Sequence, residues 1–357
     1  MTHHYAKRIA GLLVVLAAGL VLSSGVATAD ELDQKVFGDW QVGCDNVRHC
    51  AALSLPSETD ETIAYLRLDR AAGPDAPVDL TLRLRGAEKM TATPLQLALD
   101  GALFPVSGKA VVGEDTETLS LTFRPTEVSA FVEAARKARQ LTVSTGELKA
   151  TVSLAGSVAA MLWIDEKQER LKTTSALIRK GSGTTVPAAL AEPVVVAKPS
   201  SGTLSEEDGK VLTSALRAEI ARRDGDLCED DEMLVANDEA WPIDGERRLV
   251  ALACSTGAYN LMSGFWLVKG KDVATAEPVS FSQGAEEPDN MLINAGFDPE
   301  IGRLDFFSKG RGIGDCGAIG SYAWTGEVFV QTEFSMMGEC RLIGVEDWII
   351  LYRAVVK

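Results

Sequence analysis

Histidine is almost absent from this chain of 357 residues, which has three histidines, at positions 3, 4 and 49. After residue 29 the sequence also lacks a G-x-S-x-G elbow, an S-x-x-K or H-E-x-x-H pair, a Walker loop and a G-x-G-x-x-G that opens a helix. A Ser-His-Asp triad would have to use His49. A hydrolase that acts through paired carboxylates stays open, but with 51 acidic residues such pairs arise by chance. The sequence therefore favours a protein that is not an enzyme.

Long apolar runs are missing as well, except at the start of the chain. Lys7 and Arg8 precede an apolar stretch over residues 9–22, and Ala27-Thr28-Ala29 offers small residues at a signal-peptidase site. This pattern predicts a signal peptide over residues 1–29. An uncleaved anchor is the alternative, but the run is shorter than the roughly 20 residues that span a bilayer. We expect a periplasmic or secreted protein, with no membrane insertion after cleavage.

Basic residues are in the minority. Residues 1–29 contain two basic residues and no acidic ones, so residues 30–357 have 33 basic against 51 acidic residues, a net charge of −18. Such a charge disfavours nucleic acid and anionic lipid as partners. It suits a well-solvated surface or attraction to a basic envelope protein.

Six cysteines are present, Cys44, Cys50, Cys228, Cys254, Cys316 and Cys340. An even number in an exported chain predicts disulfides. Six cysteines allow 15 pairings. We favour sequential pairing, with one bridge in the first half and two in the second.

Two of these cysteines lie in FGDWQVGCDNVRHCAAL, residues 37–53. Cys44, His49 and Cys50 supply three of the four ligands of a zinc site, and a Cys-His nucleophile pair is conceivable. In an oxidising compartment, however, two cysteines this close favour a disulfide. We therefore predict a stapled turn at Asp45-Asn46, with no metal and no cofactor.

The residue pattern predicts an α+β fold that is mainly β, with two domains of antiparallel sheet, each with one or two helices and held by disulfides. In the first domain, 30–180, apolar periodicity predicts helices over 126–139, capped by Thr126, and over 157–169, capped by Ser157. Candidate strands cover 41–44, 51–55, 63–68, 78–84, 95–99, 119–123, 141–144 and 173–178.

Residues 181–203, GSGTTVPAALAEPVVVAKPSSGT, contain three prolines and no sustained period, which predicts a linker. The second domain, 204–357, begins with a helix capped by Ser205 that continues to about Arg223. Short, regularly spaced strands follow and predict an antiparallel meander.

Two segments of the second domain are candidate binding sites. Residues 224–232 are rich in Asp and Glu, but counting from Asp224 places Glu229 and Val235 where an EF-hand needs Gly and Glu. Residues 309–317 form the glycine-rich segment KGRGIGDCG. Its backbone N–H groups suit an anion-binding nest. The candidate anion-binding residues are Lys309, Gly310, Arg311, Gly312 and Gly314. The alternative, which we favour, is that these glycines let the chain turn into the Cys316 bridge.

Several residues carry a family resemblance. They are Phe37, Trp40, Cys44-Asp45-Asn46, Cys50, Asp165, Gln168, Arg170, residues 309–317, Cys340-Arg341 and Trp348. Together they resemble a family of exported proteobacterial proteins known as domain of unknown function eleven-seventy-six, over the whole chain after residue 29. The first domain also resembles the invasion-associated locus B family of small secreted β-rich proteins. Both resemblances imply a periplasmic location and disulfides, and neither implies a catalytic residue.

Three functions compete at this point. The first is a non-catalytic envelope protein that binds another macromolecule, for instance an inhibitor of a basic hydrolase such as lysozyme. The second is a module that binds a small anion or sugar through residues 309–317. The third is a carboxylate-dependent hydrolase. Export, disulfides and the charge of −18 favour the first.

Overall fold

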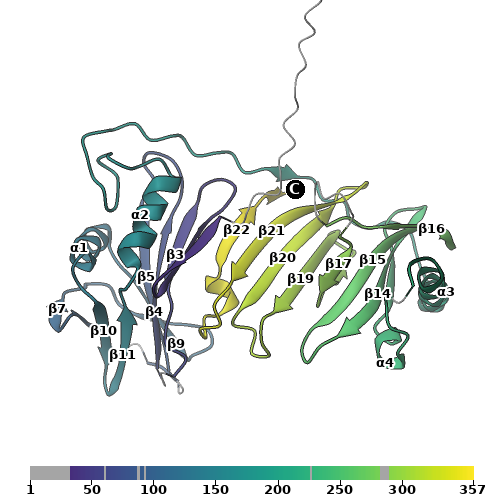
Figure 1. Cartoon of the computed structure of the whole chain (residues 1–357), viewed down its shortest axis with the longest axis horizontal. Coiled ribbons are helices and arrows are strands. Elements are labelled where there is room, and N and C mark those ends of the chain that lie inside the picture. Colours follow the sequence, from purple (N-terminus) through teal and green to yellow (C-terminus); the bar gives the residue numbers. More distant parts are fainter. Residues whose placement is uncertain (1–32, 60–61, 87–88, 92–93, 226, 282–288) are drawn as a thin grey trace, which may run out of the picture.

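A computed structural model describes residues 33–357 except 60–61, 87–88, 92–93, 226 and 282–288. The signal peptide predicted over residues 1–29 lies outside the described residues. No helix in the described part is long and apolar enough to cross a membrane. The chain forms a mainly β structure with few helices, as predicted, and its sheets follow one another along the longest axis (Figure 1).

Two antiparallel sheets form the first half. One has seven strands in the order β1-β2-β3-β4-β5-β9-β8, and the other has four in the order β11-β10-β6-β7. The large sheet consists of β1 Gln34–Phe37, β2 Trp40–Cys44, β3 Cys50–Ser54, β4 Ile63–Arg70, β5 Val78–Arg85, β8 Val111–Val112 and β9 Thr118–Thr122. The smaller sheet consists of β6 Gln96–Leu99, β7 Ala102–Phe104, β10 Gln140–Thr145 and β11 Leu148–Ser153.

Both predicted helices of the first half are present, as α1 Pro125–Ala135 and α2 Ser157–Lys167. The apolar face of α1 is buried in the core of the first half. The helix begins at Pro125, and the Glu127 carboxylate accepts the Arg124 N–H at 2.8 Å, so Thr126 is not the cap. It ends earlier than predicted because the Asp100 carboxylate accepts the N–H groups of residues 139 and 140, which lead into β10.

The strand predicted over 173–178 is absent, and a buried polar cluster takes its place. The Asp165 carboxylate, on α2, accepts the N–H groups of Leu177 and Ile178, both at 2.8 Å. Burial raises the pKa of Asp165, whose carboxylate also lies 3.7 Å from the Arg70 guanidinium. The fully buried Arg170 donates to Gln168 and to the Ser175 hydroxyl. Asp165, Gln168 and Arg170, which carry part of the family resemblance, therefore fix residues 173–178 through side-chain hydrogen bonds, where the prediction had a β ladder.

Residues 37–40, the F-G-D-W motif, lie at one edge of the core of the first half. Gly38 turns the chain with φ +56°, and Asp39 N–H donates to the Ala155 carbonyl at 2.8 Å. The Trp40 indole donates to the Ser153 carbonyl at 3.0 Å. A Cβ at Gly156 would lie 1.6 Å from the Phe37 oxygen, so this close approach requires glycine.

The second half contains two further meanders. One sheet has the order β13-β14-β15-β16, with β17 also paired to β15, and the other has the order β18-β19-β20-β21-β22. The first consists of β13 Glu239–Pro242, β14 Arg247–Thr256, β15 Leu261–Lys269, β16 Asp272–Pro278 and β17 Met291–Ile293. The second consists of β18 Gly296–Asp298, β19 Arg303–Lys309, β20 Gly317–Trp324, β21 Phe329–Met337 and β22 Ile349–Arg353. Both sheets contribute to one aromatic-rich core that includes Phe265, Trp324 and Phe329.

Helix α3 Glu206–Asp224 covers the β13–β17 sheet, and the predicted cap is confirmed, since the Ser205 hydroxyl accepts the Asp208 N–H at 3.1 Å. Its buried leucines pack in a cluster with Val250 and Trp266. A short helix, α4 Glu232–Val235, follows, and a 3-10 turn, η1 Val345–Asp347, precedes β22. Helices α3 and α4 lie at the same end of the molecule (Figure 1).

Strand β3 and most of β4 are buried on both faces. One face, with Ala52 and Leu66, belongs to the core of the first half. The opposite face, with Leu53 and Tyr65, packs with Trp348 and other apolar side chains of the second half. We call this second contact the seam. It explains why β3 and residues 63–66 of β4 are apolar on both faces, because only a strand segment covered on both sides needs that composition.

Residues 181–203 pass from the first half to the second. Strand β12 Val194–Val195 pairs in parallel with β23 Val355–Val356 near the C-terminus. The Lys198 N–H also donates to the Trp324 carbonyl at 2.7 Å. At the start of the segment, the Thr174 N–H of the first half donates to the Gly183 carbonyl at 2.8 Å, so the segment contacts both halves. Its role as a linker between two domains stays a prediction.

The seam predicts that the two halves unfold together. Leu53→Ala removes a fully buried side chain and should lower the free energy of unfolding by about 2–5 kcal/mol. Calorimetry of residues 30–357 should show one transition, shifted as a whole. Leu103→Ala, at an 80% exposed position on β7, is the matched control and should change stability by less than about 0.5 kcal/mol. A shift confined to one of two transitions would contradict the expectation.

Candidate functional site

Three disulfides join the cysteines in the sequential order that we favoured, Cys44–Cys50, Cys228–Cys254 and Cys316–Cys340. Each bonded sulfur is unavailable as a thiolate ligand or nucleophile while its disulfide persists. His49 Nε2 instead lies 3.7 Å from an oxygen of Asp69. One group of potential metal ligands occurs among the described residues, and it consists of Asp315 with the already bonded Cys316 and Cys340.

The stapled turn after Cys44 docks on the second half of the chain. The Asp45 carboxylate accepts two N–H groups of its own turn, from Val47 at 3.0 Å and from His49 at 2.8 Å. The Asn46 side chain exchanges two hydrogen bonds with the backbone of Arg353, at 3.0 and 2.9 Å. The Arg353 guanidinium in turn pairs with Asp45. These residues join two distant parts of the fold, and their contacts are structural.

The cations of the candidate anion-binding segment, residues 309–317, already have partners. Arg311 donates to Asp315 at 2.7 and 2.5 Å and lies 2.9 Å from Glu58 of the first half. Lys309 Nζ lies 5.4 Å from the centre of the Phe307 ring. An anion at this loop would have to compete with two carboxylates for Arg311. The role of this segment in anion binding stays a prediction.

Packing accounts for the glycines of this segment. A Cβ at Gly310 would lie 2.6 Å from the Cys316 sulfur, and one at Gly312 would lie 3.0 Å from the Tyr259 ring. Gly314 has a φ of +70°, which side chains rarely adopt. These positions let the β19–β20 hairpin turn tightly against its disulfide.

Beside this hairpin lies a cleft between the two halves, with a volume of about 400 Å³. We call it the seam cleft. The first half contributes Ile63, Arg85, Gly86 and Glu117, and the second half contributes Ile313, Gly314, Asp315, Leu342, Ile343 and Gly344. Sequence patterns alone placed only Gly314 among candidate binding residues. The others are ordinary residue types at positions far apart in the chain, which only the tertiary fold brings together.

Asp315 is a buried carboxylate in the wall of the cleft. Burial alone would raise the pKa of this carboxyl, but hydrogen bonds from Arg311 and from the Leu342 N–H, at 2.6 Å, outweigh burial and lower the pKa. Leu342 has a φ of +61°, a strained conformation for a leucine. Asp315 and the neighbouring Cys316–Cys340 bridge together hold this strained segment in place.

A second feature is the end of the molecule formed by α3 and α4 (Figure 1). We define the acidic end by six exposed carboxylates, Glu206, Glu207, Glu229, Asp230, Asp231 and Glu232. The buried Arg217 fixes its loop by donating to the Glu229 carbonyl at 2.8 Å and to Asp238 at 2.6 Å. The Cys228–Cys254 disulfide joins the same loop to β14. Glu229, Asp230 and Asp231 are therefore displayed on an anchored loop, and the other three carboxylates lie at the starts of α3 and α4.

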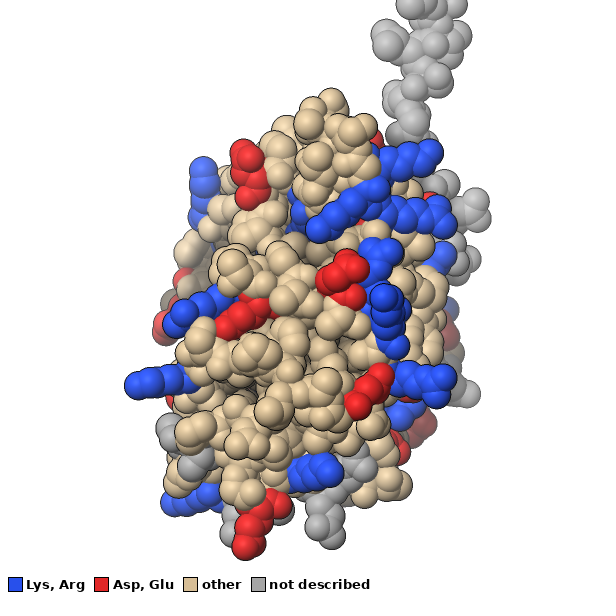
Figure 2. Space-filling view, turned by 90° about the vertical axis from the view of Figure 1, so that its left-hand side faces the viewer, with Lys and Arg blue, Asp and Glu red and all other residues tan. Residues whose placement is uncertain are grey.

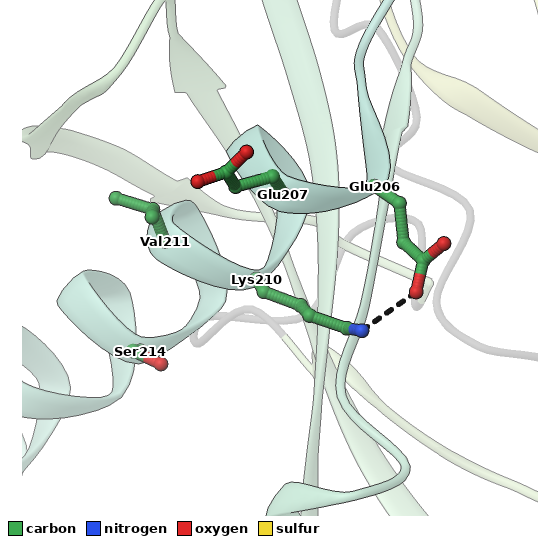
Figure 3. A pocket seen from close by; sticks show the side chains of 5 residues that line it. All are labelled: Glu206, Glu207, Lys210, Val211 and Ser214. Atoms are coloured by element: carbon green, nitrogen blue, oxygen red, sulfur yellow. Dashed lines mark hydrogen bonds and ion pairs between the residues drawn. The ribbon is translucent and has the colours of Figure 1, made fainter.

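A hollow of about 690 Å³ lies on the exposed side of α3, and Glu206, Glu207, Lys210, Val211 and Ser214 line it (Figure 3). The Lys210 ammonium pairs with Glu206 at 2.6 Å. These lining residues all belong to one helix, so they form an open surface. Such a surface is suited to contact with another macromolecule more than to enclosure of a small molecule.

Comparisons with known proteins agree with the family expected from the sequence. The family described as Protein of unknown function (DUF1176) matches residues 34–355. The Uncharacterized protein YpfG of Escherichia coli (strain K12) is 29% identical over 340 residues, which cover 89% of this chain and 92% of that protein.

One solved structure matches a part of the chain. The crystal structure of invasion associated protein b from Bartonella henselae matches 38% of this chain and 98% of its own chain, with 15% identity and a TM-score of 0.28. The match concerns a part of the chain only.

Asp315→Asn tests the anchor of the cleft wall. Because hydrogen bonding holds the folded-state pKa below the ordinary value of 3.8, this carboxylate stabilises the fold above that value, and the effect is lost as pH falls through the folded-state pKa. The variant should lose about 1–3 kcal/mol in urea unfolding near neutral pH, and the difference should shrink in acid. Asp75→Asn, at an exposed position, is the control. A deficit that grows in acid would contradict this account.

Proposed function

Because the chain belongs to the family of proteins of unknown function DUF1176, we propose from its own residues that it is an exported, non-catalytic protein that binds a basic macromolecule of the cell envelope. Three disulfides are typical of proteins outside the cytoplasm. This location supports a partner in the periplasm or at the cell surface. An inhibitor of a basic hydrolase such as lysozyme is the most concrete form of the proposal.

The observation that carries the proposal is the uneven distribution of charge. Residues 204–357 contain 28 acidic and 14 basic residues, whereas residues 30–203 contain 23 acidic and 19 basic residues. The second half thus carries −14 of the total of −18. The far end of the first half displays both signs of charge, interspersed among uncharged residues (Figure 2). A one-sided negative field steers a positively charged partner to one end of the molecule.

The acidic end also offers apolar contacts. Met233 on α4 is 73% exposed, and Leu227 and Val211 are exposed near the same carboxylates. Protein interfaces commonly combine methionine and other apolar contacts with a charged rim. Since Arg217 and the Cys228–Cys254 bridge already fix the loop, a partner would meet an ordered surface, which lowers the entropic cost of association.

Lysozyme binding with matched charge variants tests the proposal. E229Q/D230N/E232Q removes three charges from the acidic end without touching Asp231, which caps α4. The apparent Kd for lysozyme, measured by interferometry in low salt, should rise by about tenfold or more, and salt should weaken wild-type binding.

The control E114Q/E147Q/E166Q removes three exposed charges from the first half and should change the Kd by less than about twofold. An equal effect of the two triple variants would place binding elsewhere. A failure of lysozyme and of a second basic protein, cytochrome c, to bind would overturn the proposal.

A further inference from the structure

The seam cleft has an aliphatic lining and lies away from the acidic end. Ile63 and Ile343 are buried in its wall, one from each half, and Leu342 and Ile313 leave apolar surface accessible. Ile313 is 67% exposed, an unusual position for an isoleucine on a glycine-rich loop. At about 400 Å³, the cleft falls within the usual size range of small-molecule sites.

Three charged residues line the same cleft, and one of them, Asp315, is already paired with Arg311. The other two form a pair of opposite charges. The Arg85 guanidinium and the Glu117 carboxylate lie 3.9 Å apart, and about half of each side chain is exposed. A pair this long and this exposed is weak, so each group is free to take a better partner. The cleft therefore offers one positive and one negative group a few ångströms apart, beside an apolar surface.

That arrangement matches the charge pattern of a free amino acid. The α-carboxylate and α-ammonium of an amino acid are attached to one carbon, so they present opposite charges at a similarly short spacing. The carboxylate suits Arg85, whose guanidinium can donate two hydrogen bonds to it, and the ammonium suits Glu117. An aliphatic side chain would then be covered by Ile313 and Leu342.

We propose that the seam cleft binds a free α-amino acid with an aliphatic side chain, in its zwitterionic form. The wall is already shaped for a ligand, because the Asp315 hydrogen bond and the Cys316–Cys340 bridge hold Leu342 in its left-handed conformation. The site takes residues from both halves, so it exists only when the seam is formed. This inference is independent of the basic partner proposed for the acidic end.

Calorimetric titration of residues 30–357 with leucine and its derivatives tests the proposal. Leucine should bind, whereas leucinamide, which lacks the carboxylate, and N-acetyl-leucine, which lacks the ammonium, should each bind at least about tenfold more weakly. Serine should bind more weakly than leucine, because it cannot fill the apolar part. Equal binding of leucine and both derivatives would overturn the zwitterion assignment, and no binding of leucine would overturn the proposal.

Two variants locate the site. Arg85→Gln and Ile313→Ser should each weaken leucine binding by about tenfold while the melting temperature stays near that of the wild type, since both side chains are largely exposed. Arg139→Gln and Ile301→Ser change exposed residues of the same types outside the cleft and should leave binding unchanged. Leucine binding that survives both cleft variants would place the ligand elsewhere and overturn the proposal.

Discussion

The structure depends on the burial of the second face of β3 and β4 against the second half of the chain. A sheet that is apolar on both faces is stable only when both faces are covered. The second face of β3 and β4 presents the side chains of Leu53, Ile63 and Tyr65. The second half covers this face with Trp348, Ile349 and Leu351. Gly43 shows how close this packing is, since a Cβ there would lie 2.8 Å from a methyl group of Ile349.

Polar contacts surround that apolar seam and fix its register. The Tyr65 hydroxyl donates to Asp347 at 2.6 Å, and Arg83 lies 3.1 Å from the same carboxylate. Burial, together with the charge of Asp347, raises the pKa of Tyr65, so this tyrosine remains a hydrogen-bond donor. Asn46 and Arg353 form a second connection at the stapled turn. Since these groups need partners from the other half, a displaced seam would leave buried polar groups without hydrogen bonds.

The same construction divides the surface into two parts with different chemistry. At the acidic end, a disulfide and Arg217 hold carboxylates outward on one side of the molecule, and the long-range field there favours a large basic partner. At the seam cleft, charges of both signs lie close together beside aliphatic groups, and short-range complementarity favours a small zwitterion. The two proposals therefore rest on different physical interactions at different places.

The features that depend on local pattern and composition could be predicted without the structure. Residue pattern predicted α1, α2, α3 and most strands of the first half, and cysteine number and spacing favoured the disulfide order that the structure has. Local pattern failed at 173–178, where the buried Asp165 binds backbone N–H groups that a strand would use in its ladder. It also missed the covered second face of β4 and the strained Leu342. The seam, the pairing of Arg311 with Glu58 and the cleft arise only in the folded chain, because each depends on contacts between residues far apart in the sequence. Periodicity within one segment carries no information about such contacts.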